Sequence, residues 1–290
     1  MFWGAKIMGN KVIIFGASGF VGKAIKPLFD QNGILTVASS SAALNLTLPS
    51  SVQAVSDMVS DGDTVIFLSA YTPEKGDVGA LTIKNLLMIQ HVLAGIQTRF
   101  VAQFIYISSD AVYPMTSDII DEQTAPRPYD LYGHMHLMRE HYAQRKIAPE
   151  KLTILRPCAI YGKDDTHNSY SINRFIRAAL SQGEITLFGE GEEYRDHIYI
   201  DDFAALVVHV YKQRAAGILN VATGVSWRFS EIAVYIQKQV KSEVKITRRP
   251  RALAITHRHF NTSKLFDAFP NHHQRNIDRG IESFLSSLAP

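Results

Sequence analysis

The sequence is poor in cysteine, in net charge and in long apolar runs. Its single cysteine, Cys158, excludes an internal disulfide and suits a reducing compartment, so we expect a cytoplasmic protein. The net charge is only +3, from 30 basic and 27 acidic residues, which is too small to indicate nucleic acid binding. No run of 18 apolar residues is present, so no membrane span is expected. The opening MFWGAKIMGN also lacks the apolar region of a secretory signal.

Apolar residues, by contrast, are plentiful. They make up 46% of the 290 residues, so the chain can bury a sizeable core as one large α/β domain or as a domain with a smaller companion. The 11 histidines lack partners at metal-ligand spacing, and we predict no metal site. The basic segment Lys245–His259 either serves an anionic ligand or forms a solvated surface.

The stretch Lys11–Gly22, KVIIFGASGFVG, indicates a dinucleotide site. Val12–Phe15 is the continuous apolar run of a strand buried on both faces. Gly16 then permits a tight turn, Gly19 a close approach to a pyrophosphate, and Gly22 close packing of the next helix. The start of that helix offers free N–H groups to phosphates. Such glycines also suit a turn that binds nothing, but the strand before them and the amphipathic segment after them favour the dinucleotide site.

The sequence leaves the preference for NAD or NADP open. A second strand, Ile34–Ala38, runs into Ser39–Ser41, where an acidic residue would bind the adenosine ribose and select NAD. No acidic residue stands there, and no arginine or lysine stands nearby to hold a 2′-phosphate. Asn45, in a short edge strand expected at Leu44–Leu46, either meets the adenine amine or is a solvated loop residue.

Strands and helices alternate through the first half of the chain. We expect buried strands at Asp63–Ala70, Phe104–Ser108 and Leu152–Leu155, and helices at Leu81–Ile96 and 130–146. This alternation predicts an α/β fold, a Rossmann-like doubly wound parallel sheet with right-handed crossovers. The rhythm changes after Gly162. We therefore expect an NAD(P)-binding domain over 1–163, to which 203–222 returns, and a smaller C-terminal substrate lobe from 164–202 and 223–290.

Four residues form the candidate catalytic set. Tyr132 and His136 are four apart on one expected helix and share a face. Ser109 and Asp110 follow a parallel strand, at the sheet edge where ligands bind. A tyrosine beside a hydroxyl suits the transfer of a proton while a nicotinamide moves a hydride. The phenol, whose ordinary pKa is about 10, needs a nearby cation to act at neutral pH, and the serine would hold the substrate oxygen.

These motifs resemble a known family. Gly16-x-x-Gly19-x-x-Gly22, Ser108-Ser109-x-x-Val112-Tyr113 and Tyr132-Gly133 are similar to motifs of the extended short-chain dehydrogenase/reductases. Within these, the resemblance is to the NAD-dependent epimerase/dehydratase family, of the UDP-galactose 4-epimerase type, which acts on nucleotide sugars. The likeness continues in order through Leu155-Arg156-Pro157, Tyr161-Gly162, Arg195–Asp202 and Asn220-Val221, over nearly the whole chain.

The resemblance implies roles for individual residues. Ser109 matches the family's catalytic serine or threonine, Tyr132 its catalytic tyrosine, and Arg195 an arginine that reaches the substrate's diphosphate. Arg174 and Arg249 either serve the same anion or lie on the surface. The residues expected to contact the cofactor are Gly16, Ser18, Gly19, Phe20, Val21, Gly22, Ser39, Asn45, Ser69, Ala70, Asn85, Tyr132, His136 and Pro157.

The chain departs from the family at His136. The family pattern is Tyr-x-x-x-Lys, and its lysine binds the nicotinamide ribose and keeps a permanent charge near the tyrosine. Histidine, with an ordinary pKa of about 6.5, is only partly charged at neutral pH. Tyr132 would therefore be less activated, unless a carboxylate such as Glu140, one turn further on, keeps the imidazole protonated. Either His136 replaces the lysine in a working enzyme, or the site is impaired or repurposed for binding, or catalysis uses another group.

A second departure narrows the reaction. The family's 4,6-dehydratases carry an Asp-Glu pair after the serine or threonine, and this chain has Asp110-Ala111. Dehydration is therefore disfavoured, and Asp110 either takes part in the chemistry or caps its loop. We expect NAD(P)-dependent epimerisation or keto-reduction of a nucleotide-linked sugar, with Tyr132 as acid/base and Ser109 polarising the reacting oxygen. A non-catalytic NAD(P)-binding regulator of the same fold is the alternative.

The resemblance also implies a homodimer. In the family two helices per subunit, here about Leu81–Ile96 and Leu131–Lys146, form a four-helix interface. Leu87, Leu131, Met135 and Met138 are the outward apolar residues that it would bury.

Overall fold

The computed structural model describes residues 10–97, 99–116, 118–165, 171–240, 243–252 and 254–288. The chain divides into two compact units. Unit 1 comprises the chain up to Ile107 with Met138–Ile154 and Val210–Gly217, and unit 2 comprises Ser108–Leu137, Leu155–His209 and the chain from Ile218. The domain boundaries that the sequence predicts, from the change in the rhythm of strands and helices after Gly162, stay a prediction.

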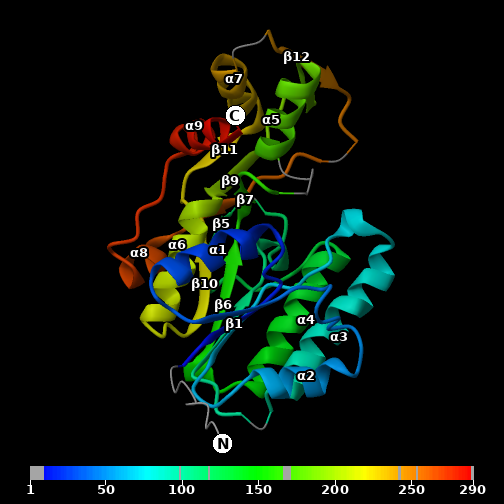
Figure 1. The fold of residues 1–290 in the computed structure, drawn as a ribbon. Coiled ribbons are helices and arrows are strands. Elements are labelled where there is room, and N and C mark those ends of the chain that lie inside the picture. The colour runs from blue at the N-terminus through cyan, green and yellow to red at the C-terminus, as the bar shows by residue number, and fades with distance from the viewer. Residues whose placement is uncertain are drawn as a thin grey trace, which may run out of the picture. The chain divides into compact units, whose positions relative to one another are not determined.

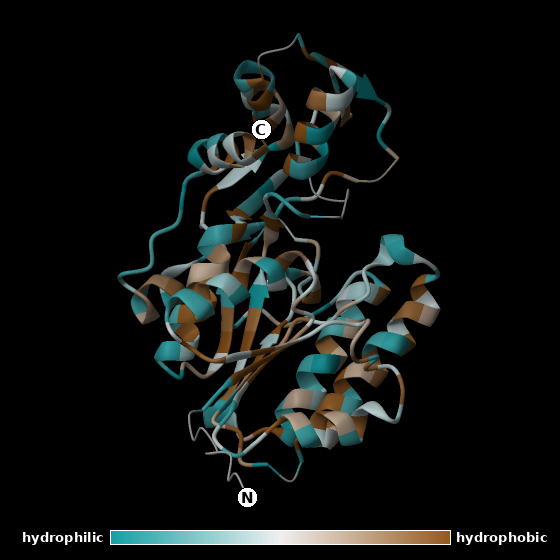
Figure 2. Ribbon diagram, viewed as in Figure 1, coloured by the Kyte–Doolittle hydropathy of each residue, from teal (hydrophilic) through white to brown (hydrophobic). Residues whose placement is uncertain are grey.

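Unit 1 is built on parallel strands. β1 (Val12–Phe15) pairs in parallel with β2 (Thr36–Ser39) and β3 (Thr64–Phe67), and β3 pairs in parallel with β4 (Gln103–Ile107). Every residue of β1 and β3 is buried, which explains their unbroken apolar runs. The complete six-stranded sheet has the order β10-β6-β4-β3-β1-β2, with β6 at Leu152–Pro157 and β10 at Gly217–Val221. The predicted Rossmann-like α/β fold is confirmed, and Figure 2 shows its central strands as mostly hydrophobic.

Helices cover the strands of unit 1. They are α1 (Phe20–Gln31), α2 (Ser51–Met58) and α3 (Val78–Gly95), with short 3₁₀ turns η1 (Pro73–Lys75) and η3 (Pro149–Lys151) and the second half of α4 (Leu131–Lys146). Helices α2 and α3 lie side by side (Figure 1). Gly95 allows this approach, because a Cβ there would lie 2.7 Å from the Val52 carbonyl oxygen. By length and hydropathy α3 could cross a membrane, and 44% of its residues are buried within the protein.

Unit 2 holds three small sheets. A three-stranded sheet has the order β11-β9-β7, and parallel pairs join β12 to β8 and β13 to β5. Helices α5 and α7 pack against β8 (Figure 1). The elements are η2 (Asp110–Val112), β5 (Ile119–Ile120), β7 (Ala159–Tyr161), α5 (Ser171–Gln182), β8 (Glu184–Phe188), β9 (Tyr194–Tyr199), α6 (Ile200–Lys212), β11 (Ser226–Arg228), α7 (Phe229–Gln239), β12 (Lys245–Arg249), β13 (His259–Phe260), α8 (Ser263–Ala268) and α9 (Ile277–Leu288).

Two local expectations were wrong. No edge strand forms at Leu44–Leu46, because the segment is a turn in which the Asn45 Oδ1 atom accepts hydrogen bonds from the Thr47 N–H at 3.1 Å and its hydroxyl at 2.7 Å. Met135 does not face outward, since it is 1% exposed within its own chain. Leu131 and Met138, expected in the same dimer surface, are 52% and 54% exposed.

Candidate active site

The glycine turn follows β1 as the sequence predicted. Gly16 has φ +94°, and a Cβ there would lie 2.9 Å from the backbone nitrogen of Ser69. A Cβ at Gly22 would lie 2.5 Å from the Gly16 carbonyl oxygen, so the helix could not sit against the turn. Gly19 precedes the first residue of α1, and its Cβ would meet only the Gly16 oxygen, at 3.3 Å. Gly16 and Gly22 therefore serve the turn itself, whereas Gly19 leaves open space beside the helix start.

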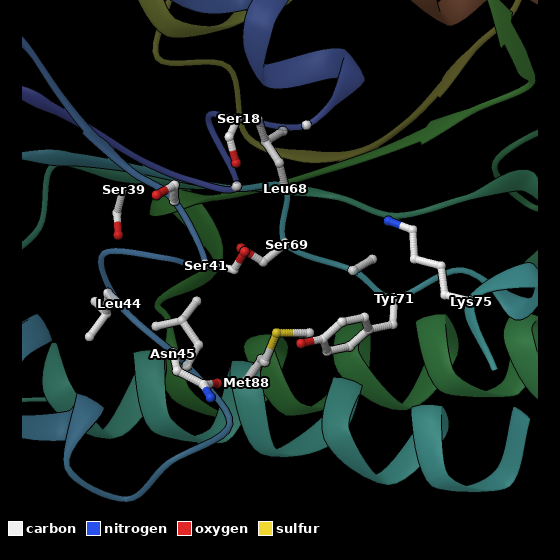
Figure 3. Close-up of a pocket in the computed structure, with 15 residues that line it drawn as sticks. Ser18, Ser39, Ser41, Leu44, Asn45, Leu68, Ser69, Tyr71, Lys75 and Met88 are labelled. Atoms are coloured by element: carbon white, nitrogen blue, oxygen red, sulfur yellow. The ribbon is translucent and has the colours of Figure 1, made fainter. Parts of the chain in front are cut away.

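A pocket opens next to this turn within unit 1, and we call it the glycine-turn pocket (Figure 3). Seven of the predicted cofactor residues line it: Gly16, Ser18, Gly19, Ser39, Asn45, Ser69 and Ala70. Phe20, Val21 and Gly22 lie in the first turn of α1 and are not among the lining residues. Among the described residues that line the pocket, Lys75 is the only charged one.

Asn85 shapes the wall of this pocket and does not line it. Its side chain accepts a hydrogen bond from the Tyr71 N–H and donates one to the Tyr71 carbonyl, each at 2.8 Å. Arg139, 1% exposed, donates to the Ser69 carbonyl at 2.9 Å and to the Asn85 carbonyl at 2.9 Å. The backbone from Ser69 to Tyr71, which lines the pocket, is therefore held from behind by two buried side chains.

A second pocket lies wholly within unit 2, and we call it the tyrosine pocket. Its volume is about 430 Å³, which is in the range of small-molecule sites. Four predicted site residues line it: Ser109, Asp110, Tyr132 and Arg195. The remaining lining residues are Ala111, Met115, Asp130, Ala159, Asp196, His197, Phe229, Arg258 and Phe260.

Local structure explains why Ser109 and Tyr132 share a pocket. Ser109 caps η2, and its Oγ accepts a hydrogen bond from the Ala111 N–H at 3.1 Å. Asp130 begins α4, because its carboxylate accepts from the Gly133 N–H at 2.8 Å. Gly133 has to be glycine, since a Cβ there would lie 2.2 Å from the Ala111 carbonyl oxygen. The start of α4, with Tyr132, is thus packed directly on the turn that presents Ser109.

His136 lies one helical turn after Tyr132, on the same face of α4. The ring centroids are 4.6 Å apart at an interplanar angle of 78°, an edge-to-face contact. His136 is 2% exposed. The sequence predicted this juxtaposition from the spacing of four residues.

Two guanidinium groups line the tyrosine pocket. Arg195 donates to the Thr256 carbonyl at 2.6 Å and to the Thr256 hydroxyl at 2.7 Å, and it lies over the Phe229 ring. Burial, followed by repulsion from Arg258, lowers the pKa of Arg195 to about 10, and attraction to Asp110 opposes both effects. The side chain is thus a half-desolvated cation, which favours an anionic group on a ligand.

Arg258 is a site residue that the sequence did not reveal. It is 5% exposed and donates to the Asp110 carbonyl at 2.6 Å and to the Tyr113 carbonyl at 3.3 Å. It also lies 3.3 Å from the Asp110 carboxylate. Arg258 therefore holds both ends of the η2 turn that Ser109 caps. The signal in the sequence was only the basic segment Lys245–His259. Two of its other members contact acidic residues elsewhere, Arg248 with Glu190 and Arg251 with Glu192.

Each carboxylate lining the described part of this pocket already has a partner. Asp110 faces Arg258, and Asp130 caps α4. Asp196 accepts from the Thr223 hydroxyl at 2.7 Å and the Gly224 N–H at 2.7 Å, and burial raises the pKa of its carboxyl. The pocket thus presents hydroxyl, phenol and guanidinium groups, with its acidic groups engaged in holding loops.

Three predicted site residues lie outside both pockets. Arg174 stacks over the Phe175 and Phe188 rings, and burial lowers its pKa. Arg249 is exposed in β12, paired in register with Phe188 of β8. Pro157 ends β6 and is buried. None of the three is among the residues that line the glycine-turn or tyrosine pocket.

A parallel sheet with a glycine turn, and a pocket that joins a tyrosine to a serine, define a dinucleotide-dependent enzyme fold of the short-chain dehydrogenase/reductase class. The chain belongs to the NAD dependent epimerase/dehydratase family, whose model matches residues 12–222. The resemblance stated from the sequence motifs is thereby confirmed.

Known proteins similar to the chain agree with this membership. An N-acetyl-alpha-D-glucosaminyl-diphospho-ditrans,octacis-undecaprenol 4-epimerase of Escherichia coli O157:H7 is 25% identical over 266 residues, covering 86% of this chain and 78% of that protein. The solved UDP-glucose 4-epimerase of Thermus thermophilus, in complex with NAD, has a TM-score of 0.83 and 19% identity, covering 95% and 98% of the two chains. RMD from Pseudomonas aeruginosa, complexed with NADPH, has a TM-score of 0.82 and 20% identity, covering 96% and 98%.

The glycine-turn pocket fits a dinucleotide on its own geometry. The space beside Gly19 is what a close backbone approach to a pyrophosphate requires, and the first turn of α1 has N–H groups without helical partners. The hydroxyl and amide groups of Ser39 and Asn45 suit an adenosine. The predicted nicotinamide cofactor, NAD or NADP, agrees both with this lining and with the family.

Proposed function

We propose that the protein catalyses NAD(P)-dependent epimerisation or keto-reduction of a nucleotide-linked sugar. The observation that carries the proposal is that Ser109, Tyr132 and Arg195 line one pocket of about 430 Å³. That pocket supplies a proton-transferring phenol, a hydroxyl to hold the reacting oxygen, and a cation for the diphosphate of the substrate. Family membership and the names of the similar proteins support the same class of reaction.

In the proposed mechanism Tyr132 takes the proton of the sugar hydroxyl that is oxidised, and returns it when the ketone is reduced. Ser109 hydrogen-bonds the same oxygen and stabilises the charge that develops there. NAD or NADP, when bound, supplies the acceptor or donor of hydride. Arg195 holds the diphosphate, so that the sugar can turn over between the two half-reactions without leaving the pocket.

The carboxylates of the tyrosine pocket favour this chemistry over dehydration. A dehydratase needs an acid for the leaving hydroxyl and a base for the adjacent carbon. Ala111 offers no carboxyl group, and the Asp110 carboxylate lies 3.3 Å from Arg258. The Asp110 carboxylate is thus engaged by a cation, and no second carboxyl group follows it in the sequence.

Three outcomes of one assay separate the candidate functions. The purified protein is incubated with UDP-hexoses, UDP-N-acetylhexosamines and UDP-4-keto-hexoses, with and without added NAD(P)H, and the products are resolved by NMR. Interconversion of epimers without net consumption of cofactor supports an epimerase. Stoichiometric consumption of NAD(P)H with a keto-sugar supports a reductase. Dinucleotide binding without turnover of any nucleotide sugar would refute the proposal and favour the alternative, a non-catalytic NAD(P)-binding regulator.

We also propose that the protein is a cytoplasmic homodimer. Leu131 and Met138 of α4 and Ile83 of α3 are exposed apolar residues on the two helices that the resemblance assigns to the interface. Light scattering at micromolar concentration should give twice the chain mass of 32.4 kDa. A monomer at that concentration would contradict the proposal.

A further inference from the structure

Three consecutive serines stand where the adenosine ribose of a dinucleotide would be held. In dinucleotide folds the residue at the end of the second strand, about 20 positions after the glycine turn, contacts the ribose 2′-hydroxyl. Ser39 occupies that place as the last residue of β2, in register with Phe15 of β1. Its carbonyl accepts hydrogen bonds from the N–H groups of Gly16 at 3.1 Å and Ala17 at 3.2 Å. These bonds fix Ser39 beside the glycine turn.

The residues after Ser39 leave this end of the pocket uncharged, with Ser40, Ser41 and Asn45 as its polar lining beside Leu44 and Leu46. The Oγ atom of Ser40 accepts from the Ala43 N–H at 3.3 Å, and the Ser40 carbonyl accepts from the Leu44 N–H at 2.9 Å. The resulting turn presents Ser41, which is exposed and also lines the pocket. Asn45 completes this end of the lining.

Charge is scarce around this pocket. Of the fifteen described residues that line it, none is aspartate or glutamate, and the single charged one is Lys75. Figure 3 shows Lys75 entering beside Tyr71, on the side of the pocket opposite Ser39. The ribose end therefore has neither the carboxylate that repels a 2′-phosphate nor the guanidinium or ammonium that selects one.

We propose that this protein binds NAD and NADP with similar affinity, because the hydroxyls of Ser39–Ser41 can form hydrogen bonds with either a 2′-hydroxyl or a 2′-phosphate. A serine hydroxyl can donate a hydrogen bond to a phosphate oxygen and can accept one from a ribose hydroxyl. The inference rests on the proposed function only in giving the glycine-turn pocket to a dinucleotide. It does not depend on which sugar reaction the protein performs.

Isothermal titration of nucleotide-free protein with NAD and NADP, in the absence of sugar, tests this inference. We expect the two dissociation constants to differ by less than about thirtyfold, since no fixed charge separates the ligands. In Ser39→Asp, NADP should bind at least about thirtyfold more weakly while NAD binding changes less than about threefold, because the new carboxylate repels the phosphate and accepts from the ribose. Gln31→Glu adds the same charge on an exposed residue outside the pocket and should change neither constant.

A second variant keeps the test decisive if an aspartate at the buried position 39 disturbs folding. Ser41→Arg, at an exposed position, should strengthen NADP binding at least about tenfold relative to NAD. A wild-type preference above about thirtyfold for either dinucleotide would overturn the inference. Equal weakening of both by Ser39→Asp in a folded protein would overturn the placement of the ribose at Ser39. Similar binding of both dinucleotides without sugar turnover would uphold this inference while refuting the proposed function.

Discussion

Replacing Arg258 by methionine is the sharpest perturbation of the tyrosine pocket. Methionine keeps much of the stem but deletes the guanidinium, which is buried and donates to the Asp110 and Tyr113 carbonyls. The Asp110 carboxylate, 3.3 Å away with its side chain 21% exposed, also loses its counter-ion. The η2 turn, which Ser109 caps, then loses the side chain that holds both of its ends.

The expected cost has two parts. The variant loses two hydrogen bonds from a charged donor, and the mostly buried Asp110 carboxylate is left without a counter-ion. Together these losses should lower the free energy of unfolding by about 3–5 kcal/mol. A displacement of Ser109 by about 1 Å should lower kcat roughly a hundredfold. Binding of NAD(P) should not change, because Arg258 is not among the residues that line the glycine-turn pocket.

The assay measures kcat, the dissociation constant of NAD(P), and the urea midpoint for Arg258→Met, Arg258→Lys and Arg251→Met. Arg251 is the matched control. It lies in the same basic segment as Arg258 and forms ion pairs with Glu192 and Glu193, but it does not line the tyrosine pocket. Its loss should lower stability but leave kcat within about threefold, whereas Arg258→Lys should recover part of both losses. A folded Arg258→Met protein with a near-wild-type kcat would refute the positioning role.

Further expectations concern the cofactor turn, the cation near Tyr132 and acid stability. Gly19→Val should abolish NAD(P) binding without unfolding the protein, because a side chain there meets open space and only one backbone atom. Calorimetry measures the binding and circular dichroism the fold. Unchanged affinity would argue against the dinucleotide site. If His136 serves as the cation for Tyr132, turnover should peak over a narrow pH range. His136→Lys should extend that range on the alkaline side, since lysine stays charged to about pH 10. An unaltered pH–rate profile in His136→Ala would show that the histidine takes no part in catalysis. Burial lowers the pKa of His197 to about 3 and that of His272 to about 4. Both are neutral in the folded and unfolded states above about pH 6.5, and below it the unfolded chain binds protons that the folded chain refuses. The free energy of unfolding should therefore fall by up to about 1.4 kcal/mol per pH unit for each histidine from pH 6.5 towards 4, and His272→Leu should show a shallower fall in urea titrations at pH 7 and 5.

Local patterns in the sequence predicted the parts of the site that local structure builds. The apolar run before Gly16 identified a buried strand, and the glycine spacing identified the turn because steric limits act between near neighbours. The four-residue spacing of Tyr132 and His136 likewise predicted that they share a face of α4, where their rings are in contact. These features depend on backbone geometry within a few residues.

Contacts between distant segments could not be predicted in this way. Arg258 reaches Asp110 across 148 positions of the chain, from a segment without regular structure before β13. The Asn85 amide bonds the Tyr71 backbone, 14 positions earlier, and so shapes the wall of the glycine-turn pocket. Its expected contact with the cofactor stays a prediction. A local contact was missed as well, since the Asn45 side chain bonds Thr47, two positions on, and forms a turn in place of the expected edge strand. In each case a polar side chain satisfied a backbone group that sequence periodicity does not record.

The most direct test of the account compares Tyr132→Phe with the wild type on nucleotide sugars. The wild type should epimerise or reduce at least one UDP-sugar. The variant, which loses only the phenolic hydroxyl, should be at least about a thousandfold slower, within the range expected for loss of a general acid/base. NAD(P) affinity measured by calorimetry should stay the same in both proteins. A Tyr132→Phe protein that turns over nucleotide sugars at the wild-type rate would contradict the central claim.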